Sequence, residues 1–186
     1  MATEIGTDRL WLRSWRSDDR EPFAVLNGDP EVMEHFPSAL SRAESDALVD
    51  RIEAFFVTHP YGLWAIERRD THKFIGFAGL SLQTFEAHFT PAIEVGWRLA
   101  REDWGHGFAT EAGRAAIAHG FQTVGLPEIV SFTGATNLRS RRVMERLGMI
   151  SDPGDDFDHP RVPVGHPLRH HVLYRLSARA WSDRGA

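Results

Sequence analysis

The sequence predicts a mixed α/β (α+β) fold, a single domain over residues 1–186 with a central, mostly antiparallel sheet and flanking helices. Three observations support this prediction. The apolar runs 63–66 and 74–80 flank a polar turn at 68–72, which is typical of an antiparallel pair of strands. A strand, a helix and a second strand then follow one another within residues 93–132, as in a parallel crossover. A chain of 186 residues with 42% hydrophobic residues can bury one core but is short for two domains.

The N-terminal part is predicted to begin with a strand over 10–15 and to continue with two helices. Residues 17–19 (Ser-Asp-Asp) can cap the first helix, which carries apolar side chains as far as Leu26. Ser41 and Glu44 form a capping box, in which the side chain of each residue bonds to the backbone N–H of the other. This pair predicts the start of the second helix.

Alternation fixes the two faces of the predicted strand 93–99. Every second side chain of a strand points to the same face, so Glu94 shares a face with Gly96 and Arg98. The opposite face is apolar and consists of Ile93, Val95, Trp97 and Leu99.

The C-terminal half is predicted to hold two helices and two strands. Small residues recur at helical spacing over 109–121, which lets this helix lie close to a sheet. A strand is expected over 128–132 and a helix over 137–147, which glycine ends. A polar loop over about 151–170 then leads to a final strand, 172–176.

Composition excludes several classes of function. The formal net charge of -5 argues against direct nucleic-acid binding. The chain has no cysteine, which excludes disulfides, thiolate metal sites and a cysteine nucleophile. It also shows no long apolar run and no basic start followed by an apolar stretch, so neither membrane insertion nor export is expected. The sequence therefore predicts a cytoplasmic protein, and it leaves a homodimer open.

Residues 104–112 read Trp-Gly-His-Gly-Phe-Ala-Thr-Glu-Ala and place two glycines where a helix should begin. The first N–H groups of a helix have no internal partner and lie at the positive end of its dipole, so they can bind a phosphate. The stretch lacks the third glycine and the later acidic residue of a dinucleotide fingerprint, and it lacks the Gly-Lys-Ser/Thr of a P-loop. A tight turn packed against the sheet is the alternative interpretation.

Three motifs occur in order along the chain. Residues 104–109 follow the pattern Q/R-x-x-G-x-G/A with Trp in the first position, and residues 137–149 follow N-x-x-S-x-x-x-x-x-x-x-G-F with Met in the last. The third motif is the opening Leu-Trp-Leu-Arg at 10–13. Together they resemble the GNAT superfamily of acyl-CoA-dependent N-acyltransferases, and in particular its RimJ/RimL-like branch of ribosomal-protein N-terminal acetyltransferases.

This resemblance implies acetyl-CoA as co-substrate, no metal, and a strand at 93–99 that splays from its neighbour. The glycine loop would bind the CoA pyrophosphate through its backbone, and the backbone around residues 97–99 would pair with the pantetheine amides. Asn137 would bond to the pantetheine arm, although a plain helix N-cap also explains it. The expected cofactor-binding residues are Trp97, Arg98, Leu99, Trp104, Gly105, His106, Gly107, Phe108, Ala109, Thr110 and Asn137.

The resemblance also implies that a primary amine attacks the acetyl thioester. Glu94 is the expected general base, directly or through water, and a solvated strand carboxylate is the alternative. Ser140 is expected near the thioester sulfur. Many family members place a tyrosine seven residues after the asparagine as the acid, but Met144 stands there and cannot donate a proton. Ser140 or a bound water would have to serve instead.

The acceptor is the least defined partner. The branch resemblance favours the α-amine of a protein or peptide N-terminus, with a small-molecule amine such as an aminoglycoside or polyamine as one alternative and a non-catalytic acyl-CoA-binding module as another. Aspartates and histidines over 155–171 raise a metal-dependent alternative, which the lack of an H-E-x-x-H spacing disfavours. Phe85, His88 and Phe89 are expected either to line the acceptor pocket or to pack in the core.

Overall fold

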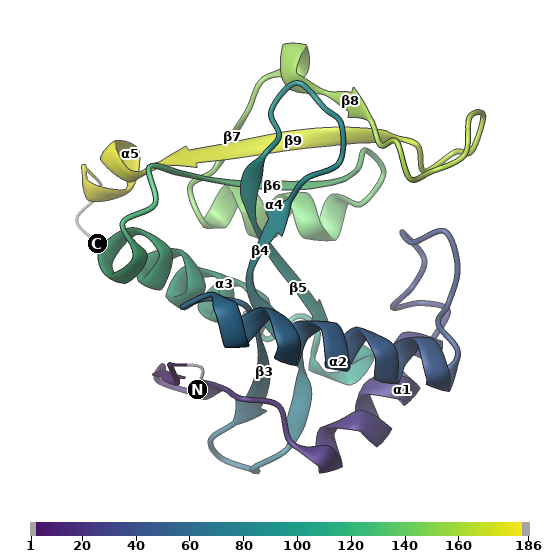
Figure 1. The fold of residues 1–186 in the computed structure, drawn as a ribbon, viewed down its shortest axis with the longest axis vertical. Helices are drawn as coiled ribbons and strands as arrows, with labels where there is room; N and C mark the ends of the chain where they lie inside the picture. Colours follow the sequence, from purple (N-terminus) through teal and green to yellow (C-terminus); the bar gives the residue numbers. More distant parts are fainter. Residues whose placement is uncertain (1–2, 184–186) are drawn as a thin grey trace.

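The computed structural model describes residues 3–183, and within this range the strands form one mixed sheet (Figure 1). The strands are β1 (Ile5–Gly6), β2 (Leu10–Arg13), β3 (Leu63–Arg68), β4 (Phe74–Gln83), β5 (Ala92–Leu99), β6 (Glu128–Gly134), β7 (Ile150–Ser151), β8 (Phe157–Asp158) and β9 (His170–Ser177). Their order is β1-β2-β3-β4-β5-β6-β9-β7, and β8 pairs with β9. All neighbours are antiparallel except β5 and β6. The predicted fold class is confirmed.

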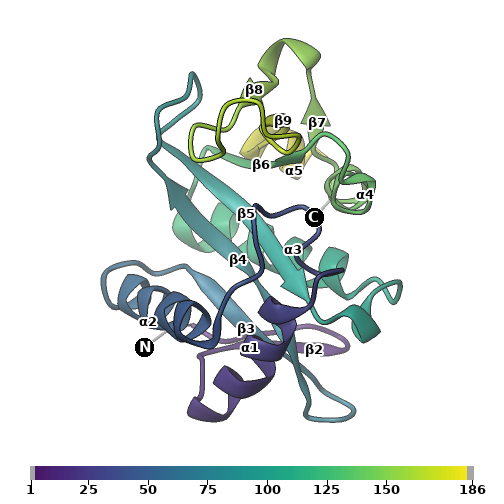
Figure 2. The ribbon, with the colours of Figure 1, turned by 90° about the vertical axis from the view of Figure 1, so that its right-hand side faces the viewer.

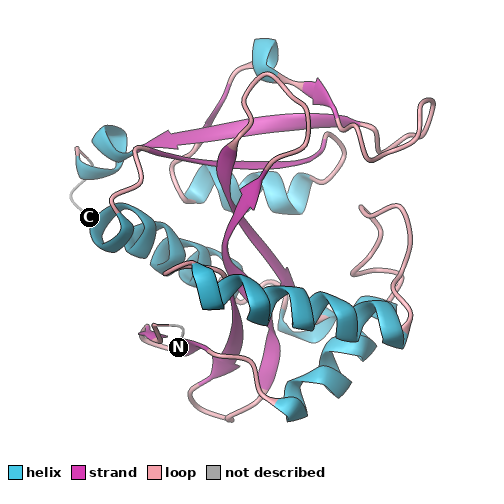
Figure 3. Ribbon diagram, viewed as in Figure 1, coloured by secondary structure: helices cyan, strands magenta, loops and turns pink. Residues whose placement is uncertain are grey.

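Helices flank this sheet, as Figure 3 shows in cyan. They are α1 (Arg20–Gly28), α2 (Arg42–Thr58), α3 (Phe108–Ala118), α4 (Leu138–Arg146) and α5 (Ala178–Ser182). The capping box predicted for α2 is present, because Ser41 Oγ accepts a hydrogen bond from the N–H of Glu44 and the Glu44 carboxylate accepts one from the N–H of Ser41. A π-helical turn over His119–Val124 continues α3.

The two faces of the sheet build two cores. Trp64 of β3 belongs to the core beneath α3, whereas its neighbour Ala65 belongs to the core beneath α1 and α2. The small residues of α3 allow a close approach, since a Cβ added at Gly113 would lie 3.0 Å from Leu147 and 3.6 Å from Trp97. The helix that begins at the glycine loop is therefore fixed against β5 and α4.

Three local predictions differ from the structure. The first long strand ends at Arg13 rather than at Trp15, because the Trp15 ring turns into the core beneath α1 and its indole N–H donates to the carbonyl of Leu63 at 2.8 Å. The predicted loop at 151–170 contains the short strand β8, which pairs with the start of β9. Helix α5, which the sequence did not predict, follows β9 and buries Trp181.

Candidate active site

Strands β5 and β6 diverge from a single point of contact. Their parallel ladder contains only the pair Glu94 and Val130, supported by a hydrogen bond of 2.8 Å from Ser131 Oγ to the carbonyl of Val95. Beyond this point, β6 and β9 run at a steep angle to β4 and β5 (Figures 1 and 2). The divergence leaves the C-terminal half of β5 without a strand on that side, as expected for the splayed cofactor strand.

The backbone N–H and C=O groups of successive β5 residues point alternately toward β4 and toward β6. The carbonyl of Val95 points toward β6, so the peptide groups of Trp97 and Leu99 point to the same side. The Leu99 carbonyl accepts a hydrogen bond from the Trp104 indole at 2.9 Å. The N–H and C=O of Arg98 instead face β4. The geometry therefore supports a pantetheine-binding backbone at Trp97 and Leu99, but not at Arg98.

The glycine loop exposes a row of free donors at the start of α3. Gly105 and Gly107 have φ angles of 80° and 81°, a left-handed conformation that favours glycine, and Gly107 is the N-cap of α3. The first helical hydrogen bond runs from the N–H of Glu111 to the carbonyl of Gly107. Among the described residues, no acceptor bonds to the N–H groups of residues 105–110. Such a row of donors is suited to a phosphate group, and pyrophosphate binding by this segment, Gly105, His106, Gly107, Phe108, Ala109 and Thr110, stays a prediction.

Arg9 stands beside this loop, and the sequence reasoning missed it. Its Nη1 donates to the carbonyl of His106 at 3.0 Å, and its guanidinium lies 4.7 Å from the centre of the Phe108 ring. Its Nε also donates to Glu111 at 2.7 Å. The N-terminal segment thus fixes the first turn of α3, and a basic residue just before the opening strand was the available signal.

Trp104 connects the loop to the start of α4. Its ring lies 5.0 Å from the guanidinium carbon of Arg101 and 4.6 Å from that of Arg139. Arg139 stands between Asn137 and Ser140 in the chain. The contact therefore shows that the two predicted cofactor-binding segments, far apart in sequence, lie close together in the fold.

Asn137 has the N-cap role that its position suggested. Its Oδ1 accepts a hydrogen bond from the N–H of Ser140 at 3.2 Å, and its Nδ2 donates to Thr133 Oγ1 at 3.0 Å. Ser140 is partly buried, and within residues 3–183 its hydroxyl has no hydrogen-bond partner. Met144, at the position of the family tyrosine, is buried in the core. A ligand role for Asn137 and Ser140 stays a prediction.

Glu94 lies where β5 and β6 separate, on the face opposite Val95. Its carboxylate accepts hydrogen bonds from Gln83 Nε2 at 2.7 Å and from Ser81 Oγ at 3.5 Å. Burial raises the pKa of Glu94 to about 8, and the two hydrogen bonds offset only part of this rise. A partly buried carboxyl group with such a pKa is suited to exchange protons near neutral pH.

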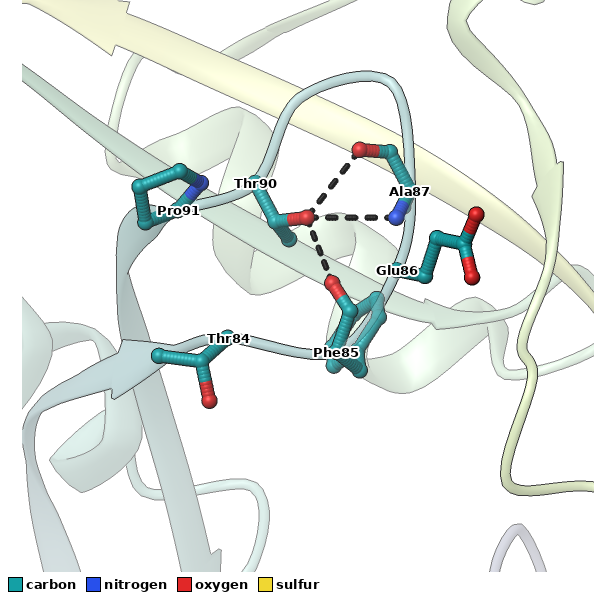
Figure 4. A pocket seen from close by; sticks show the side chains of 6 residues that line it. All are labelled: Thr84, Phe85, Glu86, Ala87, Thr90 and Pro91. Carbon is teal, nitrogen blue, oxygen red and sulfur yellow. Dashed lines mark hydrogen bonds between the residues drawn. The ribbon is translucent and has the colours of Figure 1, made fainter.

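The connection between β4 and β5 borders a cavity of about 460 Å³ (Figure 4), lined by Thr84, Phe85, Glu86, Ala87, Thr90 and Pro91. The Thr90 hydroxyl fixes the shape of this connection, because it donates to the carbonyls of Phe85 and Ala87 and accepts from the N–H of Ala87. Phe85 is buried in an aromatic cluster, so it both lines the cavity and packs in a core. Phe89 packs against the same cluster. His88 Nε2 lies 3.4 Å from Asp155 Oδ1.

The histidines of the 155–171 region do not gather around a common point. His159 and His171 pack at tilted angles against Phe85, Phe132 and Phe157, and the centres of their own rings are 5.0 Å apart. Burial lowers the pKa of His159 to about 4 and also lowers that of His171. In the part of the chain that the structure describes, no group of three or more His, Asp or Glu side chains is placed to hold a metal ion.

Comparison with known proteins decides the family. The family profile described as acetyltransferase (GNAT) domain matches residues 9–150. The chain belongs to the GNAT acetyltransferase family. An uncharacterised protein of Bacillus subtilis, YkkB, is 30% identical over 148 residues, which are 79% of this chain and 85% of that protein.

Solved GNAT structures share the fold. A GNAT acetyltransferase from Bacillus anthracis superposes with a TM-score of 0.78 at 20% identity, covering 95% of this chain and 99% of that one. RimL, a ribosomal L7/L12 α-N-protein acetyltransferase solved with coenzyme A, gives 0.75 at 16% identity over 96% and 99% of the two chains. At these identities both neighbours show the shared GNAT fold, and the second carries a name from the RimJ/RimL-like branch. Over residues 3–183 we find no helix long and apolar enough to cross a membrane.

Proposed function

We propose that this GNAT protein is an N-acetyltransferase that acts as a single domain and transfers the acetyl group of acetyl-CoA to a primary amine, preferentially the α-amine of a peptide or protein N-terminus. The divergence of β5 from β6 beside the free N–H groups of residues 105–110 is the observation that carries the proposal. A row of unpaired donors at a helix N-terminus binds phosphate groups, and an unpaired strand binds amides.

Bound acetyl-CoA supplies an acetyl thioester that an amine can attack. The glycine loop holds the pyrophosphate, and Arg9, which is paired with Glu111, fixes the loop through the carbonyl of His106. The backbones of Trp97 and Leu99, together with Asn137, hold the pantetheine arm. The Ser140 hydroxyl can pass a proton to the departing sulfur while it takes one back from water, and the thiolate needs little such help because a thiol has a pKa of about 8.5.

Glu94 takes the proton of the attacking amine. A general base is most effective when its pKa is close to the working pH, and burial raises the pKa of Glu94 to about 8. An α-amine has a pKa of about 8, so about a tenth of it is neutral at pH 7, against fewer than about one in a thousand lysine side chains. A single carboxylate base with no tyrosine acid therefore favours the α-amine.

Incubation with acetyl-CoA and two sets of peptides tests the acceptor. Peptides with a free N-terminus and a small first residue are expected to react at least about ten times faster than N-terminally blocked peptides with internal lysines, because far more of the α-amine is neutral. Released thiol and product mass measure the reaction. Equal reaction of the blocked peptides, or turnover of only an aminoglycoside or polyamine, would refute the α-amine preference and leave acetyl transfer intact.

Removal of divalent metal is expected to leave the activity unchanged. Each role proposed here, from anion binding to proton transfer, is assigned to the backbone or to the side chains of Arg9, Asn137, Glu94 and Ser140, and none of these roles uses a metal. The measurement compares turnover before and after dialysis against a chelator, with inhibition of a known zinc enzyme as the control. Activity that disappears on chelation and returns with zinc or manganese would favour the metal-dependent alternative.

A further inference from the structure

The guanidinium of Arg98 is a largely enclosed cation without a carboxylate beside it. The side chain extends from β5 toward the end of α1, where its Nη1 donates to Asn27 Oδ1 at 2.6 Å. The rings of Phe36 and Phe77 lie 4.2 and 5.6 Å from its central carbon. Its Nε is buried without an acceptor, and within residues 3–183 no carboxylate pairs with it.

Arg13 is a second buried arginine, and in its case carboxylates balance the charge. It donates to Asp19 from both terminal nitrogens at 2.7 and 2.8 Å and to Glu67 from Nε at 2.7 Å. Burial alone would lower the pKa of Arg13, but these hydrogen bonds raise it. Burial lowers the pKa of Arg98 to about 10, so this guanidinium stays charged at neutral pH without an anion to balance it.

Arg98 lies on the side of β5 that carries Glu94, the proposed general base. Glu94 and Arg98 share one face of the strand, whereas the free peptide groups of β5 point along the sheet toward β6. The connection between α1 and α2, drawn in pink at the right of Figure 3, covers this face with Phe36, which is 38% exposed. His35 beside it also has a buried ring nitrogen without a partner.

We infer that Arg98 binds a carboxylate of the acceptor, so that the substrates of this acetyltransferase are amines that also carry an acidic group. The inference rests on the proposed acetyl transfer and names the substrate class of the same site. A guanidinium offers two parallel N–H donors to a carboxylate, and the unpartnered Nε of Arg98 belongs to such a pair; because this nitrogen is buried, the partly exposed Phe36 has to move aside for the paired contact. A carboxylate there would supply the missing countercharge and the missing acceptor together.

The spacing along β5 sets the distance between amine and acid. Arg98 lies four positions after Glu94, which corresponds to about 13 Å along a strand. An extended peptide with its α-amine at Glu94 reaches Arg98 with its third to fifth residue. An acidic side chain at these positions, or the C-terminal carboxylate of a short peptide, has the right chemistry.

Matched peptides test this inference. Ala-Ala-Ala-Asp-Ala amide and its Asp-to-Asn counterpart differ only in the acidic group, and a third peptide, Ala-Ala-Ala-Ala with a free or an amidated C-terminus, separates the two sources of carboxylate. The wild-type protein is expected to favour the acidic member of at least one pair by about tenfold or more in kcat/KM, mainly through KM. In Arg98→Gln this ratio is expected to fall to about one. In Arg98→Lys it should be intermediate, because the charge stays and the paired donors are lost.

The ratio of kcat/KM for the acidic peptide to that for the neutral peptide does not depend on which fraction of a variant preparation is active. A thermal shift with acetyl-CoA confirms that each variant is folded. Equal kcat/KM for acidic and neutral peptides in the wild-type protein, or a preference that survives in Arg98→Gln, would overturn the inference while acetyl transfer stands. If no amine releases thiol from acetyl-CoA, the proposed function fails, and the inference fails with it.

Discussion

Glu94→Gln is expected to lower kcat by about a hundredfold or more near neutral pH, because an amide of the same shape cannot accept the proton of the amine. The acetyl-CoA thermal shift should change little, since Glu94 lies on the face of β5 that we assign to the acceptor and not at the glycine loop. Glu4→Gln, a change at an exposed glutamate, is the matched control. Full activity of Glu94→Gln across pH 6 to 9 would show that Glu94 is structural.

The raised pKa of Glu94 adds two tests to the same variant. The deprotonated form is the base, so wild-type turnover should rise with pH through about 8 and then level off. The folded state holds this proton more tightly than the unfolded chain, in which a glutamate has a pKa of about 4.3. Stability from this group is therefore fully present below about pH 4 and is lost as the pH rises to about 8. Glu94→Gln should melt at a higher temperature than the wild-type protein at pH 9 and should match it at pH 4.

Sequence patterns predicted the parts of this site that depend on local chain geometry. Alternation over 93–99 placed Glu94 opposite Val95, and the two glycines marked the start of α3, because both patterns follow from the repeat of a single strand or helix. The capping box at Ser41 is equally local.

Features that depend on distant contacts were out of reach. The N–H and C=O of Arg98 point toward β4, which depends on the pairing of the two strands and not on the local sequence. The lack of a carboxylate beside the Arg98 guanidinium also depends on the fold, which places Asn27 and Phe36 there. The pKa of Glu94 likewise depends on its burial and on Gln83 across the hairpin. Strand β8 escaped prediction because a pair of residues gives no periodic signal.

Gly107→Glu is expected to weaken acetyl-CoA binding by at least about a hundredfold. The new side chain would point from the N-cap of α3 into the space that the free N–H groups leave for the pyrophosphate. Two like charges about 4 Å apart repel by about 4 kcal/mol at an effective dielectric constant of about 20, and solvent screening reduces this value. Arg9 Nη2, 3.5 Å from an added Cβ, would attract the new carboxylate and hold it at this position.

The measurement is the rise in melting temperature on adding acetyl-CoA, which reports preferential binding to the folded state. A residue with a Cβ is strained at a φ of 81°, so Gly107→Glu itself should melt at a lower temperature without ligand. Gly165→Glu separates this strain from ligand binding, because Gly165 has a φ of 83°, faces open space and lies outside the glycine loop. That variant should lose a similar amount of stability and keep the full acetyl-CoA shift. A folded Gly107→Glu protein with an unchanged shift would place the pyrophosphate elsewhere, because the added charge and bulk could not then lie in its path.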